Sequence, residues 1–167
     1  AVITMTFTGL TMTACSQSGG SGSAGESSLS EAYKDYFPIG AAIGGDHLES
    51  YDTVLLKRHF SSVTAENDMK PSRTLGDSGE FTFEAGDRIV EFARRNGMMV
   101  RGHTLVWYNQ TPEWFFRDSA GAYLSREAML EQMKNYIHGV LDHYRGKVYA
   151  WDVVNEAVMK DGSWRQC

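Results

Sequence analysis

Four short apolar runs recur along the chain from residue 33 onward, and longer amphipathic stretches separate them. Each run has the length of a strand and is bounded by Gly, Pro or polar residues, which predicts a buried strand. Near-continuous apolar character, without strict alternation, is typical of parallel strands that are covered on both faces. The predicted strands are 37–44, 60–67, 98–107 and 147–155.

The stretches between these strands space their apolar residues three or four positions apart, which predicts amphipathic helices at 48–60, 84–97 and 125–146. Gly97 is placed to end the second helix, and Ser125 is placed as the N-cap of the third. The resulting β-α-β-α-β-α-β order indicates a parallel sheet whose strands are joined by helical crossovers.

Two α/β architectures fit this order, an open doubly wound sheet and a (β/α)8 barrel. The first strand-to-helix turn, "GAAIGGDH" (40–47), lacks the G-x-G-x-x-G spacing of dinucleotide-binding folds, and no G-x-x-x-x-G-K-[ST] motif occurs. The sequence therefore argues against the dinucleotide-binding form of the open sheet.

The amino-terminal residues differ from the rest of the chain. Residues 1–15 are apolar and small, too short to anchor in a bilayer, and resemble the end of a secretory signal peptide that begins before this sequence. The ending "TMTAC" resembles a bacterial lipoprotein box with Cys15 as the lipid acceptor; a plain signal peptide, with Cys15 incidental, is the alternative. Residues 16–31 are rich in Gly and Ser and predict a flexible linker to a folded domain at 32–167. A secreted, cell-surface or periplasmic lipoprotein is expected, with a possible outer-membrane anchor.

Composition narrows the range of partners. The chain has 167 residues, 42% of them hydrophobic and 22% charged, as in a globular protein with one folded domain. Its net charge of -5 gives no reason to expect a nucleic-acid partner. The two cysteines, Cys15 and Cys167, lie near opposite ends and form neither a metal-binding pattern nor an expected disulfide.

Polar residues gather where the last three predicted strands end. In a parallel barrel these ends meet on one face, and that face carries the active site. The sequence therefore predicts a site built from residues of three strands. Its members are Glu66, Asn67 and Lys70 after the second strand, His103, Trp107 and Gln110 at and after the third, and Asn155 and Glu156 after the fourth.

Each of these residues also has a purely structural interpretation. Glu66 and Lys70 are four apart and could form a helical ion pair. His103 taken alone is more typical of a hydrogen-bonded core histidine. Trp151 is expected in the core, and Asp152 is expected to bond a neighbouring strand. The functional interpretation rests on the joint pattern.

Three motifs, in order and correctly spaced, resemble glycoside hydrolase family 10, the retaining endo-1,4-β-xylanases. They are "TAENDMKP" (64–71), "GHTLVW" with "QTPEWF" (102–107 and 110–115), and "WDVVNEA" (151–157). The resemblance runs from residue 33 to the end of the chain. It implies a (β/α)8 barrel that cuts the xylan backbone without a metal or organic cofactor, of which this chain holds about the first four β/α units.

The resemblance also implies roles for single residues. Glu156 matches the general acid/base, Asn155 the amide that bonds the 2-hydroxyl of the sugar at the cleavage point, and His103 a histidine that holds the same sugar. The residues that match the lining of the glycone subsites are Glu66, Asn67, Lys70, Trp107 and Gln110.

One position departs from the family pattern. The family usually has a His or a similar polar residue after the tryptophan, whereas "WYNQ" places Tyr108 and Asn109 there. The spacing between Trp107 and Gln110 is kept, so the sugar-binding assignment is expected to hold.

The expected chemistry needs a second carboxyl. A glycosidic oxygen is a poor leaving group, so a carboxylic acid that is still protonated near neutral pH must donate to it. Retention of configuration then requires a nucleophilic carboxylate about 5–5.5 Å from that acid. In the family this nucleophile lies on a late barrel strand, in the half that this chain lacks. Glu66 is the weaker candidate, since its context matches sugar binding and Lys70 is expected to pair with it. The chain alone is expected to be inactive, and the complete protein to be a monomer.

Two other functions remain open. An Asn-Glu pair that ends the fourth strand is shared by related barrel enzymes that cut β-glucan or mannan. A non-catalytic lipoprotein that binds glycans at the cell surface could also use such a barrel, although an intact acid/base argues against it.

Overall fold

The computed structural model describes residues 27–50 and 52–165. Residues 1–15 with Cys15, most of the predicted linker 16–31, and Cys167 lie outside them. A short helix, α1 (Leu29–Tyr33), occupies the end of the predicted linker, and the Ser28 side chain caps it by accepting from the Glu31 N–H at 3.1 Å. The folded part therefore begins slightly before residue 32.

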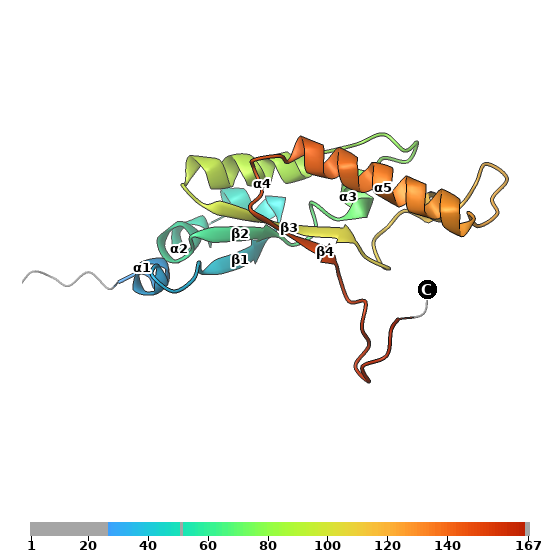
Figure 1. Cartoon of the computed structure of the whole chain (residues 1–167). Coiled ribbons are helices and arrows are strands. Elements are labelled where there is room, and N and C mark those ends of the chain that lie inside the picture. The colour runs from blue at the N-terminus through green and yellow to red at the C-terminus, as the bar shows by residue number, and fades with distance from the viewer. Residues whose placement is uncertain (1–26, 51, 166–167) are drawn as a thin grey trace, which may run out of the picture.

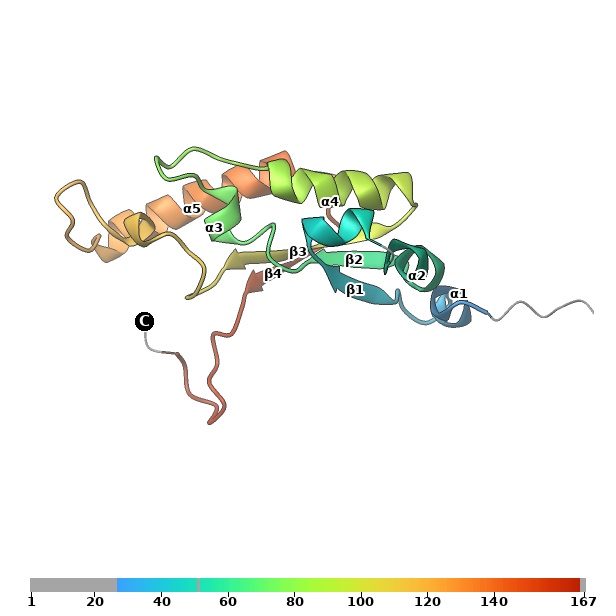
Figure 2. The ribbon, with the colours of Figure 1, turned by 180° about the vertical axis from the view of Figure 1, so that it is seen from behind.

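Four parallel strands form one sheet in the order β1-β2-β3-β4, so each strand pairs with its predecessor in the sequence. Helices α3, α4 and α5 lie on the same face of this sheet (Figures 1 and 2). A doubly wound sheet reverses its strand order and carries helices on both faces. Sequential order with one-sided helices is instead the arrangement of consecutive units in a (β/α)8 barrel. The strands are β1 (Gly40–Ile43), β2 (Ser62–Ala65), β3 (Met99–Val106) and β4 (Ala150–Val154).

The long helices confirm the predicted ones, and the short ones were not foreseen. A single helical turn is too short to show a 3.6-residue period, so α1, α3 and the two 3-10 helices left no signal in the sequence. The helices after α1 are α2 (Asp52–His59), α3 (Pro71–Thr74), α4 (Glu84–Arg95) and α5 (Arg126–His143), with 3-10 helices η1 (Gly45–Glu49) and η2 (Glu113–Phe116).

The predicted helix ends agree with the structure at two places and differ at one. Gly97 follows α4 with a φ of 65°, a conformation that glycine adopts without strain. The Ser125 hydroxyl caps α5 by accepting from the Ala128 N–H at 3.2 Å. The helix predicted at 48–60 is confirmed over 52–59, where α2 lies, but its predicted start is wrong, because 48 and 49 belong to η1. Within α2, Leu55 is 52% exposed, and Leu56 enters the core.

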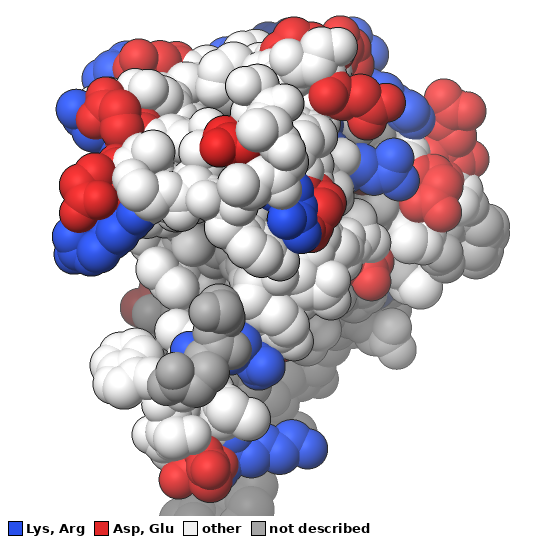
Figure 3. All heavy atoms as spheres, turned by 90° about the vertical axis from the view of Figure 1, so that its right-hand side faces the viewer, with Lys and Arg blue, Asp and Glu red and all other residues white. Residues whose placement is uncertain are grey.

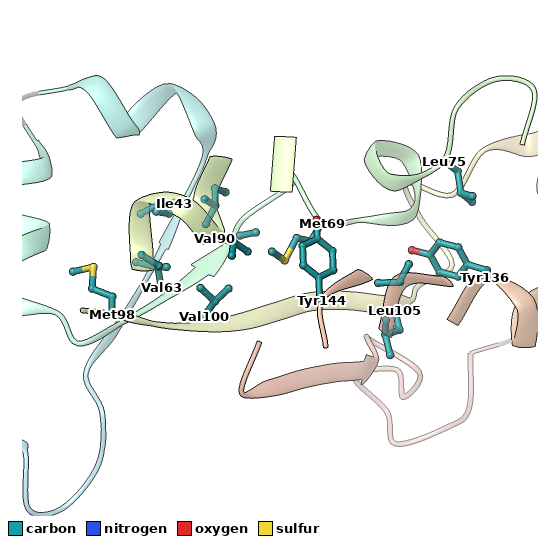
Figure 4. Close-up of a cluster of buried hydrophobic side chains, with 14 of the residues drawn as sticks. Ile43, Val63, Met69, Leu75, Val90, Met98, Val100, Leu105, Tyr136 and Tyr144 are labelled. Carbon is teal, nitrogen blue, oxygen red and sulfur yellow. The ribbon is translucent and has the colours of Figure 1, made fainter. Parts of the chain in front are cut away.

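The hydrophobic core lies between the sheet and the helices. Figure 4 shows Ile43 and Val63 from the sheet beside Val90 from α4, and Met69 beside Tyr144 just after α5. Val63 and Met69 are fully buried. This packed layer sets the distance between strands and helices. It therefore also sets the positions of the loops that follow the carboxyl ends of the strands.

The prediction that the strands are covered on both faces is wrong for β1 and β4. Ile43 is the only buried residue of β1, and Val153 and Val154 of β4 are 56% and 57% exposed. The physical reason is that helices cover one face of the sheet, and β1 and β4 each pair with one neighbour among the described residues. None of the described helices is long and apolar enough to cross a membrane.

Candidate active site

Glu156 lies just beyond the carboxyl end of β4, beside the end of β3. The Asn155 N–H donates to the Val106 carbonyl at 2.9 Å, which extends the contact between the two strands past their regular pairing. Trp107, which follows β3, donates its indole Nε1–H to Oε2 of Glu156 at 3.0 Å. Two strands thus place a carboxyl group and an aromatic ring in direct contact.

Glu156 and Gln110 both adopt left-handed backbone conformations, with φ values of 54° and 49°. Residues with a Cβ rarely adopt them, and at functional sites the surrounding structure holds such residues in place. The Gln110 carbonyl accepts from the Ser72 N–H at 2.8 Å, which fastens the loop after β3 to α3. The two residues therefore sit in loops that are held from several sides.

Lys70 is 6% exposed although it carries a charge. Its Nζ donates to Oδ1 of Asn67 at 2.8 Å and lies 4.6 Å from the centroid of the Trp107 ring. A cation over an indole face is a favourable electrostatic contact. Lys70 therefore joins the residues after β2 to the ring that contacts Glu156.

The expected pairing of Lys70 with Glu66 is wrong. Residues 66–70 are not helical, so the four-residue spacing does not bring the two side chains together. Glu66 is exposed, while the Lys70 side chain turns under Trp107 and bonds Asn67. Pro71 starts α3 directly after Lys70, which keeps Lys70 itself out of the helix, with a φ of -73° and a ψ of 157°.

Asp152 of β4 links two residues of β3. Its Oδ1 accepts from the Arg101 guanidinium, with Nε at 3.0 Å, and its Oδ2 lies 3.0 Å from Nδ1 of His103. Burial raises the pKa of Asp152, but hydrogen bonds from Arg101 and His103 prevail and hold that pKa below its usual value. The expectation that Asp152 bonds a neighbouring strand is confirmed.

This contact also fixes the tautomer of His103. A carboxylate only accepts hydrogen bonds, so Nδ1 of His103 carries the proton facing Asp152. Nε2 of the neutral imidazole is then an acceptor. A histidine in this state can accept a bond from a sugar hydroxyl.

The structure brings most of the predicted site residues to one end of the sheet. Trp107 contacts both Lys70 and Glu156, and its ring centroid lies 6.5 Å from that of His103. Asn67 joins through Lys70, and Asn155 precedes Glu156. Glu66 follows β2 and Gln110 follows β3, and both side chains are exposed.

Sequence reasoning missed three contributors, Arg101, Tyr108 and Arg165. A signal existed for Arg101, which stands two positions before His103 and so on the same face of β3. Tyr108 and Arg165 are 57 positions apart, and their contact depends on a hairpin that the sequence did not reveal.

A cavity of about 770 Å³ opens beside Glu156 and Trp107. Apolar and aromatic side chains from η2, α5 and the residues after β4 form most of its wall, including Phe116, Met133 and Trp164. On the side of the carboxyl ends of the strands, uncharged side chains cover much of the surface, and charges of both signs lie among them and around the margins (Figure 3). The described residues contain no group of three His, Cys, Asp or Glu side chains that could hold a metal ion.

The model of Glycosyl hydrolase family 10 matches residues 28–167. The chain belongs to this family. The family expected from the three motifs is thereby confirmed, and so is the expected fold, a set of consecutive β/α units from the first half of a (β/α)8 barrel.

Similar proteins include several family 10 xylanases. Endo-1,4-beta-xylanase A of Thermotoga maritima is 53% identical over 135 residues, which cover 78% of this chain and 13% of that protein. Endo-1,4-beta-xylanase B of Paenibacillus barcinonensis is 47% identical over 144 residues, covering 82% of this chain and 43% of that one. The crystal structure of endo-1,4-beta-xylanase from Caldicellulosiruptor owensensis matches with a TM-score of 0.79 and 48% identity, over 84% of this chain and 43% of that one. The chain spans less than half the length of these family 10 relatives.

Proposed function

We propose that the complete protein is an endo-1,4-β-xylanase that hydrolyses the xylan backbone with retention of configuration, and that Glu156 is its general acid/base. The observation that carries this proposal is the contact between Glu156 and Trp107, at the strand ends where Lys70 and His103 also gather. Membership of the family and similarity to proteins named endo-1,4-beta-xylanase support it.

In the first step the Glu156 carboxyl gives its proton to the glycosidic oxygen as the bond from that oxygen to C1 breaks. A second carboxylate attacks C1 from the opposite face and forms a glycosyl ester. The leaving sugar departs as a neutral alcohol, and Glu156 is left as a carboxylate. Trp107 Nε1–H, already bonded to Oε2, restricts the orientation of the carboxyl group during this transfer.

In the second step a water molecule attacks C1 and the ester bond breaks. The Glu156 carboxylate accepts the proton of that water and returns to the acid form. The second carboxylate is released unchanged, and the sugar keeps its original configuration after two inversions. The atoms and protons of the two steps balance without any metal or organic cofactor.

The second carboxylate is proposed to come from a barrel strand that this chain does not span, because the chain covers 43% of relatives such as the xylanase of Paenibacillus barcinonensis. Glu66 is the alternative, since it follows β2 at the same end of the sheet. Its exposed side chain suits contact with substrate hydroxyls better than a desolvated attack on C1. The chain alone is therefore expected not to hydrolyse xylan.

The remaining residues are proposed to hold xylan or xylo-oligosaccharide. Asn155 is neutral and can bond the 2-hydroxyl of the sugar at the cleavage point. His103 offers Nε2 to the same sugar, because Asp152 occupies Nδ1. Trp107 offers a flat face for a sugar ring, and Lys70 and Asn67 border that face. Glu66 and Gln110 are proposed to contribute at the outer glycone subsites.

Placement at the cell surface is also a proposal, and it rests on the sequence before residue 27. A lipid on Cys15, followed by the Gly/Ser-rich linker, would hold the barrel near a membrane. Fractionation of cells that express the complete gene tests this, because Cys15→Ser should move the protein from the membrane to the soluble fraction.

Glu156→Gln in the complete protein tests the acid/base role. The variant should lose at least about 100-fold of its turnover on xylan, since general acid catalysis contributes about 10²–10⁴-fold. It should still release a dinitrophenolate from an aryl xyloside in a rapid first step, because that leaving group needs no proton. Unchanged turnover of xylan would rule out the role. Comparison of xylan with carboxymethyl-cellulose as substrates separates the xylanase from a glucanase.

A further inference from the structure

Arg165 ties the hairpin after β4 to the backbone of Glu156. Its Nε donates to the Glu156 carbonyl at 3.0 Å, and its backbone N–H donates to the Ala157 carbonyl at 2.8 Å. Val158 and Trp164 form an antiparallel bridge between these contacts and the turn. The hairpin therefore closes onto the residue that carries the carboxyl group.

The same guanidinium also stacks on Tyr108. Its central carbon lies 3.9 Å from the centroid of the Tyr108 ring, which belongs to the loop after β3. Tyr108 in turn meets the Trp107 ring edge to face, with centroids 5.8 Å apart. Arginine prefers such stacking because its planar charge is weakly hydrated and its N–H groups stay free for hydrogen bonds in the plane.

These contacts close a ring of four residues. Trp107 bonds the side chain of Glu156, Arg165 bonds its backbone, and Tyr108 contacts both Trp107 and Arg165. Glu156 is held from both ends while its backbone has a φ of 54°, which a residue with a side chain does not favour. Without the bond to its carbonyl, Glu156 has a more favourable backbone conformation to relax into, and the carboxyl group would move with it.

We propose that Arg165 and Tyr108 are positioning residues that set the orientation of the Glu156 carboxyl group. This inference rests on the proposed function. Neither Arg165 nor Tyr108 has an expected sugar-binding role, and Tyr108 is a residue that departs from the usual family pattern. A misplaced acid slows the first step where the leaving group needs a proton, and leaves the first step unaffected where the leaving group needs none.

The test compares two substrates in the complete protein carrying Arg165→Ala. Turnover of xylan, whose leaving group needs a proton, should fall about 10- to 100-fold with KM little changed. Release of dinitrophenolate from an aryl xyloside in the first step should change less than about threefold. Equal losses on both substrates, or no loss on either, would overturn the proposal.

Arg117→Ala is the matched control. Arg117 stacks on Tyr123 at 4.1 Å in the same way, but neither residue contacts Glu156. Its loss should leave the ratio of the two activities unchanged. Tyr108→Ala should reproduce the effect of Arg165→Ala, whereas Tyr108→Phe keeps the ring and should retain most activity. The Tyr108 variants also test the proposal if Arg165→Ala does not fold.

Crystal structures of the complete wild-type protein and of Arg165→Ala provide a readout that does not depend on activity. The distance from Trp107 Nε1 to Glu156 Oε2 is 3.0 Å with Arg165 in place. It should lengthen beyond hydrogen-bonding range in the variant. An unmoved carboxyl group would overturn the positioning role. If the wild-type protein cleaves neither substrate, the proposed function fails instead, and these structures still decide the positioning role.

Discussion

Single residues of the site act through partners on neighbouring strands. Asp152 illustrates this, because its two oxygens bind Arg101 and His103, which stand on the same face of β3. Without the carboxylate, the guanidinium of Arg101 loses a charged partner and the ring of His103 is free to rotate. Asp152 thus determines which nitrogen of His103 is left free to accept a hydrogen bond.

Asp152→Asn should make stability less sensitive to acid. The pKa of Asp152 in the folded protein lies below its usual value of 3.8, so its contribution is present above about pH 4 and is lost as pH falls through the lowered value. The free energy of unfolding of the wild type should therefore fall more steeply below about pH 4 than that of the variant. Urea titrations at several pH values measure this, and parallel curves would contradict it. At pH 7 the variant should be less stable by about 1–3 kcal/mol.

Lys70→Met should weaken sugar binding without removing the side chain's bulk. The ammonium group bonds Asn67 and lies over Trp107, and its loss removes a charged donor worth about 1.5–3 kcal/mol. The value of kcat/KM on xylan should fall about 10- to 100-fold. Lys57→Met is the control, because Lys57 lies 5.6 Å over Phe92 on the exposed side of α2. Equal effects of the two substitutions would argue against a role for Lys70 in the site.

At the scale of elements, the sequence could predict the order of strands and helices and the end of the sheet that holds the site. Periodicity over α4 and α5 and the position of polar residues after each strand suffice for that. The burial of each strand was not predictable from the sequence. An apolar run such as 37–44 looks the same whether one or two strands pair with it. The contact between Lys70 and Asn67 was missed because the bend before α3 decides which side chain Lys70 contacts.

Gly102→Ala should disturb the contact between β3 and β4. A Cβ at this position would lie 2.3 Å from the Trp151 ring, which packs against Tyr144 in the core. The substitution should lower the free energy of unfolding by about 1–3 kcal/mol, measured by urea denaturation. Adding Trp151→Leu should reduce the penalty of Gly102→Ala, since the ring that clashes is gone. A penalty that is the same in both backgrounds would show that the ring is not its cause.

At the scale of the whole molecule, the described part presents apolar surface that a barrel would cover. Val153 and Val154 on β4 are more than half exposed, Trp164 is 72% exposed, and the wall of the cavity beside Glu156 is largely apolar. An edge strand with free N–H and carbonyl groups pairs readily with another chain. The strand order places β1 and β4 at the two edges of the sheet.

Residues 27–167 expressed alone should therefore self-associate and should not hydrolyse xylan. Light scattering after gel filtration should report species larger than one chain at micromolar concentrations. Val153→Lys should shift these species toward the monomer, because a charge on an edge strand opposes pairing, and Glu131→Lys on the exposed part of α5 is the control. A stable monomer would contradict the prediction, and xylan hydrolysis would contradict the need for a second carboxylate from elsewhere.

Each strand of this sheet pairs with the strand that was synthesised just before it. A chain leaving the ribosome can therefore add one β/α unit at a time to a growing edge, without waiting for a distant partner. Pairing with the preceding strand closes a shorter loop, and so costs less chain entropy, than pairing with a more distant strand would. The order of the strands thus allows Glu156 and its ring of contacts to form as soon as β3 and β4 have paired and the hairpin after β4 has closed.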